Sequence, residues 1–301
     1  MSNIRSLDPK AIPVAELQSW LQHGIAPRPI CFASTVSKDG VVNLSPFSFF
    51  NLFSTMPPVC IFSPSRRVRD CTIKHTLENV LEVPEVVINI VNYSMVQQMS
   101  LSSTEYPKGI NEFEKSGLTM LPSDLIRPPR VAESPMQLEC KVTEIKPLGT
   151  GPGAGNLVLA EVLRLHIKES VIHASGSIDQ GKMDLVARLG ANWYCRVGKE
   201  NLFEVAKPLK SLGIGVDALP SHVFHSEVLS GNDLGRLGNL EALPTDPQLS
   251  AVHLMPEVRD ISNQALTKVE LTIAFHRLAK QYIRENNLET ALAILCSCPI
   301  T

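Results

Sequence analysis

The chain has 301 residues, of which 44% are hydrophobic and 19% are charged, so it can form a sizeable core and lacks the composition of a disordered protein. Its formal net charge is -2 and no basic block stands out, which argues against nucleic acid or an anionic membrane surface as the main partner. The N-terminus lacks the apolar core of a secretion signal, and no uncharged apolar run is long enough to span a membrane. We therefore expect a cytoplasmic protein with one large domain, or a domain plus an extension.

The cysteines are scattered and odd in number, which argues against a disulfide framework, and no CxxC pair indicates a zinc ribbon. They are Cys31, Cys60, Cys71, Cys140, Cys195, Cys296 and Cys298. We expect most of them to be reduced, packed thiols, and no metal site. Cys296 and Cys298 are expected to be thiols of a frayed tail, with a redox or metal role as the alternative.

The first predicted strands form a hairpin. Residues 29–36 are apolar and strand-like, and the Asp39-Gly40 step after them is typical of a hairpin turn. Residues 41–50 return as a second strand, in which Pro46 indicates an edge position or a bulge. After the Met56-Pro57-Pro58 break, residues 59–64 predict a short buried strand.

Short helices and strands alternate in the next segment. Residues 69–82 are compatible with a helix that Asp70 caps. The β-branched residues 85–91 predict a strand, and residues 94–102 look helical. Residues 103–135 contain five prolines and are expected to be rich in loops.

Two long strands, over residues 136–148 and 156–170, are predicted around a glycine-rich run at 149–155. That run is not a nucleotide-binding loop, because no Gly-Lys-Ser/Thr follows it and the next element is a strand; we expect a flexible hairpin loop. Residues 171–175 are a further candidate strand. About six or seven strands with few helices favour an antiparallel barrel over a doubly wound α/β sheet.

The pattern changes near residue 200, which predicts two domains, 1–200 and 201–301. Residues 207–250 are expected to form loops and short turns, with an ordered loop at 230–244 that either covers the active site or mediates dimer formation. From Pro256 onward, amphipathic spacing predicts one or two helices, a break at Asn286-Asn287 and a final short helix. His222 and His225 lack neighbouring ligands and are not expected to bind metal.

Five segments between Pro27 and Arg196, taken in order, carry a resemblance to a known family. The first is Arg28-Pro29-Ile30 with AST and NLSPFSFF, the second Pro57-Pro58 with CIFSPS, the third Arg69-Asp70-Cys71-Thr72 with EVVINIV, the fourth YPKGINEFEKSGLT with Glu133-Ser134-Pro135 and LEC, and the fifth EVLRLHI with Ala187-Arg188-Leu189-Gly190 and Trp193-Tyr194. Together they are similar to the flavin-reductase-like, FMN-binding split-barrel family. The resemblance covers more than half of the chain but not its last hundred residues.

The resemblance implies a mainly β fold, an antiparallel FMN-binding split barrel followed by a helical C-terminal extension. It also implies a homodimer that holds FMN near the subunit interface. NAD(P)H would stack on the isoalloxazine and pass a hydride from its C4 to flavin N5, with no catalytic side chain required of the protein. The electron acceptor stays open between free flavin, a partner monooxygenase and a small organic substrate.

The segment NLSPFSFF is the first candidate flavin site. By pattern alone it is a half-buried strand with one polar face. The resemblance favours flavin contacts here, and it also brings the end of the first strand and the CIFSPS segment to the cofactor. The implied residues are Ser34, Thr35, Asn43, Leu44, Ser45, Pro46, Phe47, Ser48, Phe62 and Ser63.

The candidate phosphate site is a basic, hydroxyl-rich stretch ahead of the predicted helix, since a helix N-terminus beside cations binds anions. Its members are Ser63, Ser65, Arg66, Arg67, Arg69, Asp70 and Thr72, and a solvated basic loop is the alternative. The family commonly shows Lys-Asp-Thr here. This chain has Arg69-Asp70-Cys71, so Thr72 would have to supply the hydroxyl donor. Arg28 is either a second phosphate partner or a surface charge.

Two further residues are candidates by resemblance. His166 would contact the flavin or the nicotinamide, although a strand histidine is more often a hydrogen-bonded structural residue. Tyr194 would lie close to the flavin, in its own subunit or across the dimer, or else fill the end of the barrel. An NAD(P)H-dependent flavin oxidoreductase is therefore our leading hypothesis. A non-enzymatic FMN-binding redox carrier or sensor, and an interaction protein that has lost the flavin, are the alternatives.

Overall fold

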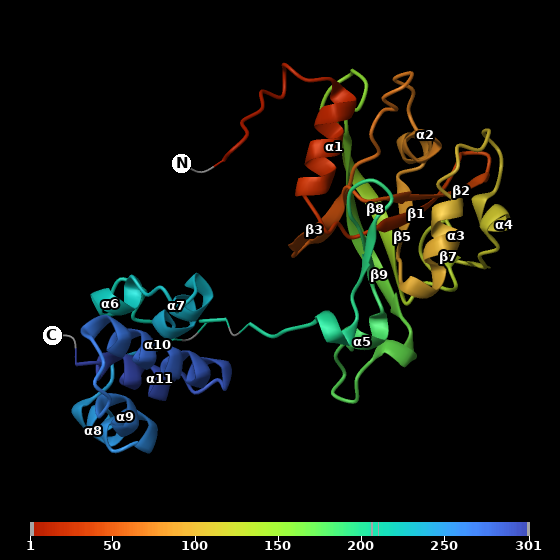
Figure 1. Cartoon of the computed structure of the whole chain (residues 1–301). Helices are drawn as coiled ribbons and strands as arrows, with labels where there is room; N and C mark the ends of the chain where they lie inside the picture. Colours follow the sequence, from red (N-terminus) through yellow and green to blue (C-terminus); the bar gives the residue numbers. More distant parts are fainter. Residues whose placement is uncertain (1–2, 206, 210, 300–301) are drawn as a thin grey trace. The chain divides into compact units, whose positions relative to one another are not determined.

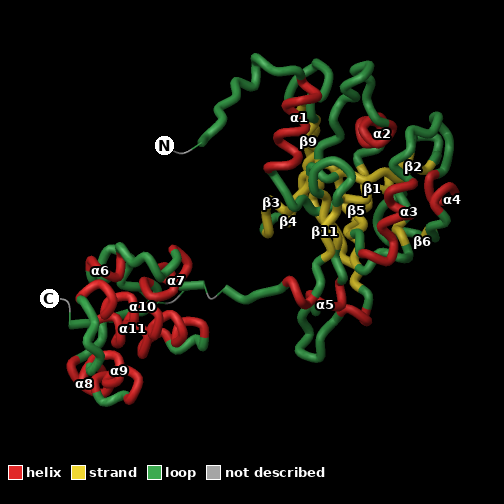
Figure 2. Tube along the Cα trace, in the orientation of Figure 1, coloured by secondary structure: helices red, strands yellow, loops and turns green. Residues whose placement is uncertain are grey.

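The computed structural model describes residues 3–205, 207–209 and 211–299. The chain divides into two compact units, Met1–Phe203 and Glu204–Thr301 (Figure 1). Strands are gathered in the first unit, whereas the second is helical (Figure 2). No helix within the described residues is both long and apolar enough to cross a membrane.

The first unit is built on a seven-stranded antiparallel sheet with the order β2-β1-β5-β8-β9-β4-β3. Its strands are β1 (Cys31–Val36), β2 (Val42–Phe47), β3 (Phe50–Thr55), β4 (Pro58–Phe62), β5 (Glu85–Ile90), β8 (Met136–Pro147) and β9 (Asn156–Ile167). The predicted mainly antiparallel fold is confirmed, as are the edge position of Pro46 and the glycine-rich β8–β9 hairpin.

The sheet must curl strongly, because its two edge strands are consecutive in the chain. Six strand spacings would separate the edges of a flat sheet by about 29 Å. Only Ser48 and Phe49 connect β2 to β3, and this connection spans at most about 11 Å. The edges therefore approach each other at that end, although no pairing among the described residues closes them into a complete barrel.

Alternation along the strands sends apolar side chains into two clusters, one on each face of the sheet. Cys31 and Ala33 join the cluster covered by helix α2 (His75–Glu82). Phe32 joins the cluster that also contains residues of α3 (Val96–Leu101) and α4 (Glu112–Ser116). The remaining elements of this unit are α1 (Val14–Gly24), η1 (Tyr93–Met95), β6 (Met120–Leu121), β7 (Arg130–Val131), η2 (Glu169–Val171), α5 (Gln180–Met183), β10 (Val186–Arg188), β11 (Tyr194–Arg196) and η3 (Lys199–Asn201).

Three predicted elements of the first unit are wrong. The single strand expected over residues 41–50 is two strands, β2 and β3, and residues 51–55 had not been expected to be extended. Residues 171–175 form no strand and make only an isolated bridge from Ile172 to Ile178. The helix expected to start at Asp70 begins at His75, because the Asp70 carboxylate accepts the N–H of Thr72 and closes a local turn.

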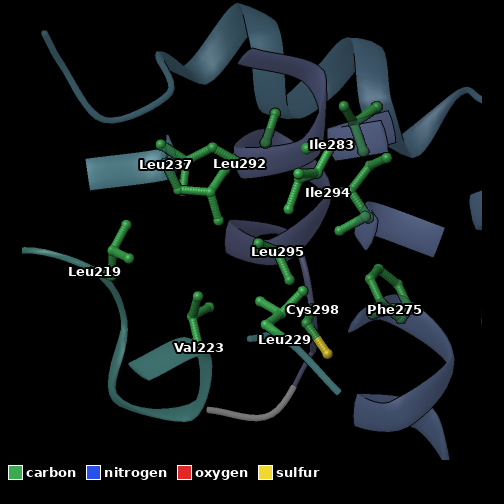
Figure 3. Close-up of a cluster of buried hydrophobic side chains, with 14 of the residues drawn as sticks. Leu219, Val223, Leu229, Leu237, Phe275, Ile283, Leu292, Ile294, Leu295 and Cys298 are labelled. Atoms are coloured by element: carbon green, nitrogen blue, oxygen red, sulfur yellow. The ribbon is translucent and has the colours of Figure 1, made fainter. Parts of the chain in front are cut away.

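In the second unit, the described residues form six helices around an apolar core of their own. They are α6 (Ser221–Phe224), α7 (Gly231–Gly238), α8 (Asp246–His253), α9 (Pro256–Ser262), α10 (Lys268–Arg284) and α11 (Leu288–Cys296). Figure 3 shows Leu237, Phe275, Ile283 and Leu295 meeting in this core. The predicted break is confirmed: Asn286 has a φ of 62°, and the Asn287 side chain accepts the N–H of Thr290 and caps α11.

Two expectations for the second unit are corrected. Residues 230–244, expected to be a loop, contain α7, which begins with a capping box between Ser230 and Asp233 and buries Leu237. The final cysteines are not in a frayed tail: Cys298 is only 7% exposed and lies in the core beside Leu229 and Leu295 (Figure 3).

Candidate functional site

A small hollow of about 60 Å³ lies where strand β2, the start of α2 and the segment after α3 converge. Its wall includes the polar residues Asn43, Ser45, Thr76 and Ser103, the cationic residues Lys74 and Arg67, and the carboxylate residues Glu105 and Glu112. A hollow of this size holds a phosphate-sized group but not a flavin ring, since pockets for whole ligands have volumes of about 300 Å³ or more.

The start of α2 presents unpaired hydrogen-bond donors. Lys74 is the N-cap residue, in an extended conformation and with no side-chain capping bond. The backbone N–H groups of His75 and Thr76 therefore have no partner from the helix, and the helix dipole makes this end positive. The Thr76 hydroxyl accepts a hydrogen bond from Asn43 Nδ2 at 2.9 Å, which ties the helix to β2.

The Lys74 ammonium is half-buried and has no carboxylate partner among the described residues. Burial lowers the pKa of Lys74 and the Arg67 guanidinium lowers it further, while the charge of Glu105 partly opposes both effects. Nζ lies 5.0 Å from the centre of the Phe47 ring, within the range of a cation–π contact. A half-buried cation that has no ion pair among the described residues, beside N–H groups that the helix leaves without a partner, fits an anion.

The predicted phosphate residues Arg69, Asp70 and Thr72 are brought together by the structure, but away from the hollow. Arg69 Nη2 is 2.9 Å from Asp70 Oδ2 and 3.0 Å from Glu105 Oε2. Asp70 Oδ1 accepts the Thr72 hydroxyl at 2.6 Å. The bonds from Thr72, followed by that from Arg69, hold the pKa of Asp70 well below its usual range. These groups satisfy one another, and the Arg69 side chain is 71% exposed.

Two of the residues predicted to contact flavin are unavailable to it. The backbone N–H of Leu44, which points out of the sheet edge, donates to Glu112 Oε2 at 3.0 Å. Burial raises the pKa of that Glu112 carboxyl. Phe62 is completely buried and packs on Phe47, with ring centres 5.5 Å apart. Neither Leu44 nor Phe62 lines the hollow.

Ser34, Thr35 and Ser63 do not line the hollow. Thr35 is buried and accepts hydrogen bonds from Asn79 Nδ2 at 3.1 Å and from Asn43 Nδ2 at 3.5 Å. The buried Ser34 hydroxyl has no partner among the described residues. The Ser63 N–H donates to the carbonyl of Phe49. By contrast, Asn43 and Ser45 line the hollow. Pro46 follows in β2, and Ser48 lies in the connection from β2 to β3.

Arg28 is not a surface charge. It is buried, and its guanidinium donates to the carbonyl oxygens of Gln22, Ile25 and Leu189, the last at 2.8 Å. Its Nη donors are therefore committed to the backbone, and the residue joins the segment after α1 to the one after β10. Neither predicted role accounts for this position.

His166 is a hydrogen-bonded structural residue. Its Nε2 lies 2.7 Å from Oε1 of the buried Glu139. Burial opposes ionisation of Glu139, but the N–H groups of Asp124 and Leu125 donate to the carboxylate and hold its pKa below the ordinary value. In the strand register His166 is four strands from Pro46, about 19 Å along the sheet. The structure therefore places His166 on a different part of the sheet from the β2 edge, and it does not line the hollow.

Tyr194 lies in a second, larger depression of about 460 Å³. Its ring lies under the Arg188 guanidinium, 4.6 Å from the guanidinium carbon to the ring centre. Ser103 belongs to the wall of both depressions, so the two are adjacent. The Ser103 hydroxyl itself donates to the carbonyl of Ser100 at 2.6 Å.

Sequence reasoning missed Lys74, His75 and Thr76. The signal was present, because Lys74-His75-Thr76 is closer to the family's Lys-Asp-Thr than Arg69-Asp70-Cys71 is. The predicted N-cap was Asp70, whereas the actual N-cap is Lys74. Of the predicted basic stretch, Arg67 does line the hollow, but Arg69, Asp70 and Thr72 do not.

Comparisons with known proteins match the first unit of the chain to one family. The family described as "Flavin reductase like domain" matches residues 23–182. An uncharacterized protein of Aquifex aeolicus is 35% identical over 172 residues, which cover 57% of this chain and 85% of that protein.

Two solved structures give the same result. The nitrilotriacetate monooxygenase component B of Bacillus cereus has a TM-score of 0.63 and 28% identity, covering 68% of this chain and all (100%) of that one. A Shewanella frigidimarina protein described as a flavin reductase with a split barrel domain has a TM-score of 0.56 and 24% identity, over 65% and 96% of the two chains. The latter likeness supports the split-barrel fold.

Proposed function

Because this chain belongs to the flavin reductase-like domain family, we propose that its first unit, the predicted domain 1–200, binds FMN and works as an NAD(P)H-dependent oxidoreductase. One observation carries the proposal for this chain. Lys74, which has no ion pair among the described residues, and the residues His75 and Thr76, whose N–H groups have no partner within the helix, line a phosphate-sized hollow at the edge of β2.

In this proposal the flavin phosphate occupies the hollow. Its negative charge supplies the partner that Lys74 lacks, and its oxygens accept the N–H groups at the start of α2. Ser45 lines the same hollow, and its hydroxyl is a further donor for the phosphate. We therefore assign phosphate binding to Lys74, His75 and Thr76. Arg69, Asp70 and Thr72 are not assigned to it, because they already form hydrogen bonds with one another.

The flavin ring then lies along the outer edge of β2, from Ser45 to Ser48. Main-chain groups of alternate residues point outward at a strand edge. Pro46 has no N–H to offer, and Glu112 already holds that of Leu44, so carbonyl oxygens dominate this edge. They suit the N–H donor of a flavin ring, and Glu112 holds the strand in position.

The chain's contribution to the reaction is binding and orientation. When bound, the flavin supplies the acceptance of a hydride from NAD(P)H. No side chain has to move a proton at the reacting atoms, so we assign none as catalytic. The protein's task is to hold the ring against the β2 edge and leave one face open for the nicotinamide.

We further propose that the first unit forms a homodimer through β3. This edge strand and the turn after it expose Leu52, Phe53 and Met56, the last two by 64% and 90%. An apolar, unpaired strand edge is a typical association surface.

All seven cysteines are free, which supports a reducing compartment such as the cytoplasm.

The test begins with the colour of the purified protein and its uptake of added FMN. NADH and NADPH are then added separately without oxygen, and bleaching of the flavin absorption is followed. We expect FMN to bind and at least one nucleotide to bleach it. A chain that takes up no FMN contradicts the flavin proposal. Bound FMN that neither nucleotide bleaches contradicts the reductase and favours a redox carrier or sensor.

The electron acceptor can be tested with the same preparation. Because the Bacillus cereus structure is a monooxygenase component B, we propose that reduced FMN is passed to a partner monooxygenase. Release of reduced FMN from the protein is expected, and it can be followed by trapping with an excess of a second flavin-binding protein. Retention of all reduced FMN through turnover contradicts this role.

A further inference from the structure

The depression around Tyr194 is large enough for a nucleotide. Its volume is about 460 Å³, within the range of about 300–1,000 Å³ typical of small-molecule sites. It contains two tyrosines, Tyr93 and Tyr194, each lying under an arginine. Gln97, Ser100 and Asn192 add hydrogen-bonding groups of both kinds to the wall.

The two arginines of this depression differ in their charge balance. Arg196 is neutralised by Asp184, with Nε to Oδ1 at 2.6 Å and Nη2 to Oδ2 at 2.9 Å. Arg188 forms no ion pair with any described residue; its guanidinium stacks on Tyr194 and donates to the carbonyl of Ala191. Arg188 therefore brings an uncompensated positive charge to the wall.

A second uncompensated arginine lies behind the first. Arg28 is buried, is bonded only to carbonyl oxygens, and leaves its Nε without a partner among the described residues. Its backbone pairs with that of Arg188. Burial lowers the pKa of Arg28, and the positive charge of Arg188 lowers it further. Two neighbouring cations without a carboxylate attract an anion to this face.

We propose that this depression binds the ADP-ribose half of the nicotinamide nucleotide, with a phosphate on Arg188 and the adenine or ribose against Tyr194. The inference rests on the proposed function. A simple anion would use only the arginine, and an uncharged aromatic compound only the tyrosine, whereas a nucleotide uses the arginine through its phosphate and the tyrosine through its base or sugar. The wall shared at Ser103 places this ligand next to the hollow assigned to the flavin phosphate.

The test uses the FMN-loaded protein and titrates ADP-ribose, which lacks the nicotinamide, with adenosine and inorganic phosphate as partial probes. We expect ADP-ribose to bind and to compete with NAD(P)H. In Arg188→Gln its affinity should fall about tenfold or more, while adenosine binding changes little. The KM for NAD(P)H should rise with kcat nearly unchanged, as expected when uniform binding is lost.

Two further variants keep the outcome interpretable. Arg188→Lys keeps the charge but loses the planar stack, so it should lose less affinity than Arg188→Gln. Arg127→Gln removes an exposed arginine paired with Glu85, far from this wall in sequence, and should leave ADP-ribose binding unchanged. The FMN affinity of each variant is measured separately by fluorescence titration.

Three results would overturn the inference. The first is a wild-type, FMN-loaded protein that does not bind ADP-ribose. The second is Arg188→Gln with unaltered ADP-ribose affinity. The third is Arg188→Gln that loses FMN together with ADP-ribose, which would assign the depression to the flavin. Failure of the proposed function itself is recognised differently, because the wild-type protein would then take up no FMN at all.

Discussion

Two basic groups lie within ten residues of one another in the first unit, and they differ in what surrounds them. Arg69 shares its charge with Asp70 and Glu105 in an exposed network. Lys74 is half-buried, has no ion pair among the described residues, and lies at a helix start whose amides are free. An anion site is therefore indicated by unpaired cations and donors, and not by the density of arginine.

The difference between Lys74 and Arg69 can be tested by substitution, and we expect the largest change in FMN affinity from Lys74→Met. This substitution keeps the length of the side chain and removes its charge. Loss of a charge-assisted contact to phosphate should weaken FMN binding by about tenfold to hundredfold. Quenching of FMN fluorescence measures the dissociation constant. The matched control, Arg69→Met, should change it by about twofold at most, as is typical of an exposed ion pair. The reverse order of the two variants would refute the assignment.

The strands of this unit were predictable because their apolar residues are β-branched or alternate, as in residues 85–91. β3 was not, because Leu52 and Phe53 are adjacent and both exposed, so the segment has no alternation to detect. Its strand conformation depends on pairing with β4. A pattern of residues within the segment itself does not reveal such pairing.

Helix boundaries failed for related reasons. Asp70 has the chemistry of an N-cap, yet its carboxylate closes a turn with Thr72, and Cys71 adopts a positive φ of 60°. The glycine-rich α7 reads as a loop from propensity alone. Packing of Leu237 in the helical core and the Ser230 capping box stabilise it as a helix.

The candidate site was predictable in region but not in detail. Asn43 and Ser45 were expected at the cofactor and do line the hollow. Whether a polar group near the site is free to bind the cofactor depends on its hydrogen-bond partners, and these can be far away in the sequence. The Leu44 N–H is taken by Glu112, which is 68 residues further along the chain.

A second prediction concerns the hydroxyl of Thr76. Thr76→Val preserves the shape of the side chain but leaves Asn43 Nδ2 without its 2.9 Å acceptor. We expect about tenfold weaker FMN binding and a free energy of unfolding lower by about 1–2 kcal/mol. Urea denaturation and FMN titration measure the two effects. Thr72→Val is the control, and its FMN affinity should remain that of the wild-type protein. Equal losses in both variants would contradict the distinction between the two groups.

The pH dependence of FMN binding tests the state of Lys74. Binding needs the protonated ammonium, and burial together with Arg67 lowers its pKa below the ordinary lysine value. The affinity should therefore fall by several-fold as the pH rises through the lowered pKa of Lys74, that is, at a lower pH than for an ordinary lysine. Lys74→Arg should keep its affinity to higher pH, because a guanidinium stays charged. A flat profile for the wild-type protein would mean that this ammonium does not hold the phosphate.

The smallest expected effect comes from Glu105, which lines the hollow together with Arg67 and pairs with both Arg67 and Arg69. Glu105→Gln removes the carboxylate that lies 3.0 Å from both Arg67 Nε and Arg69 Nη2. The freed positive charge should strengthen FMN binding by about twofold to threefold at low ionic strength. Because the groups are partly exposed, salt should abolish the gain. A large gain that persists in high salt would show that the arginine network, once freed, contacts the phosphate directly, and would erase the difference between the two basic groups.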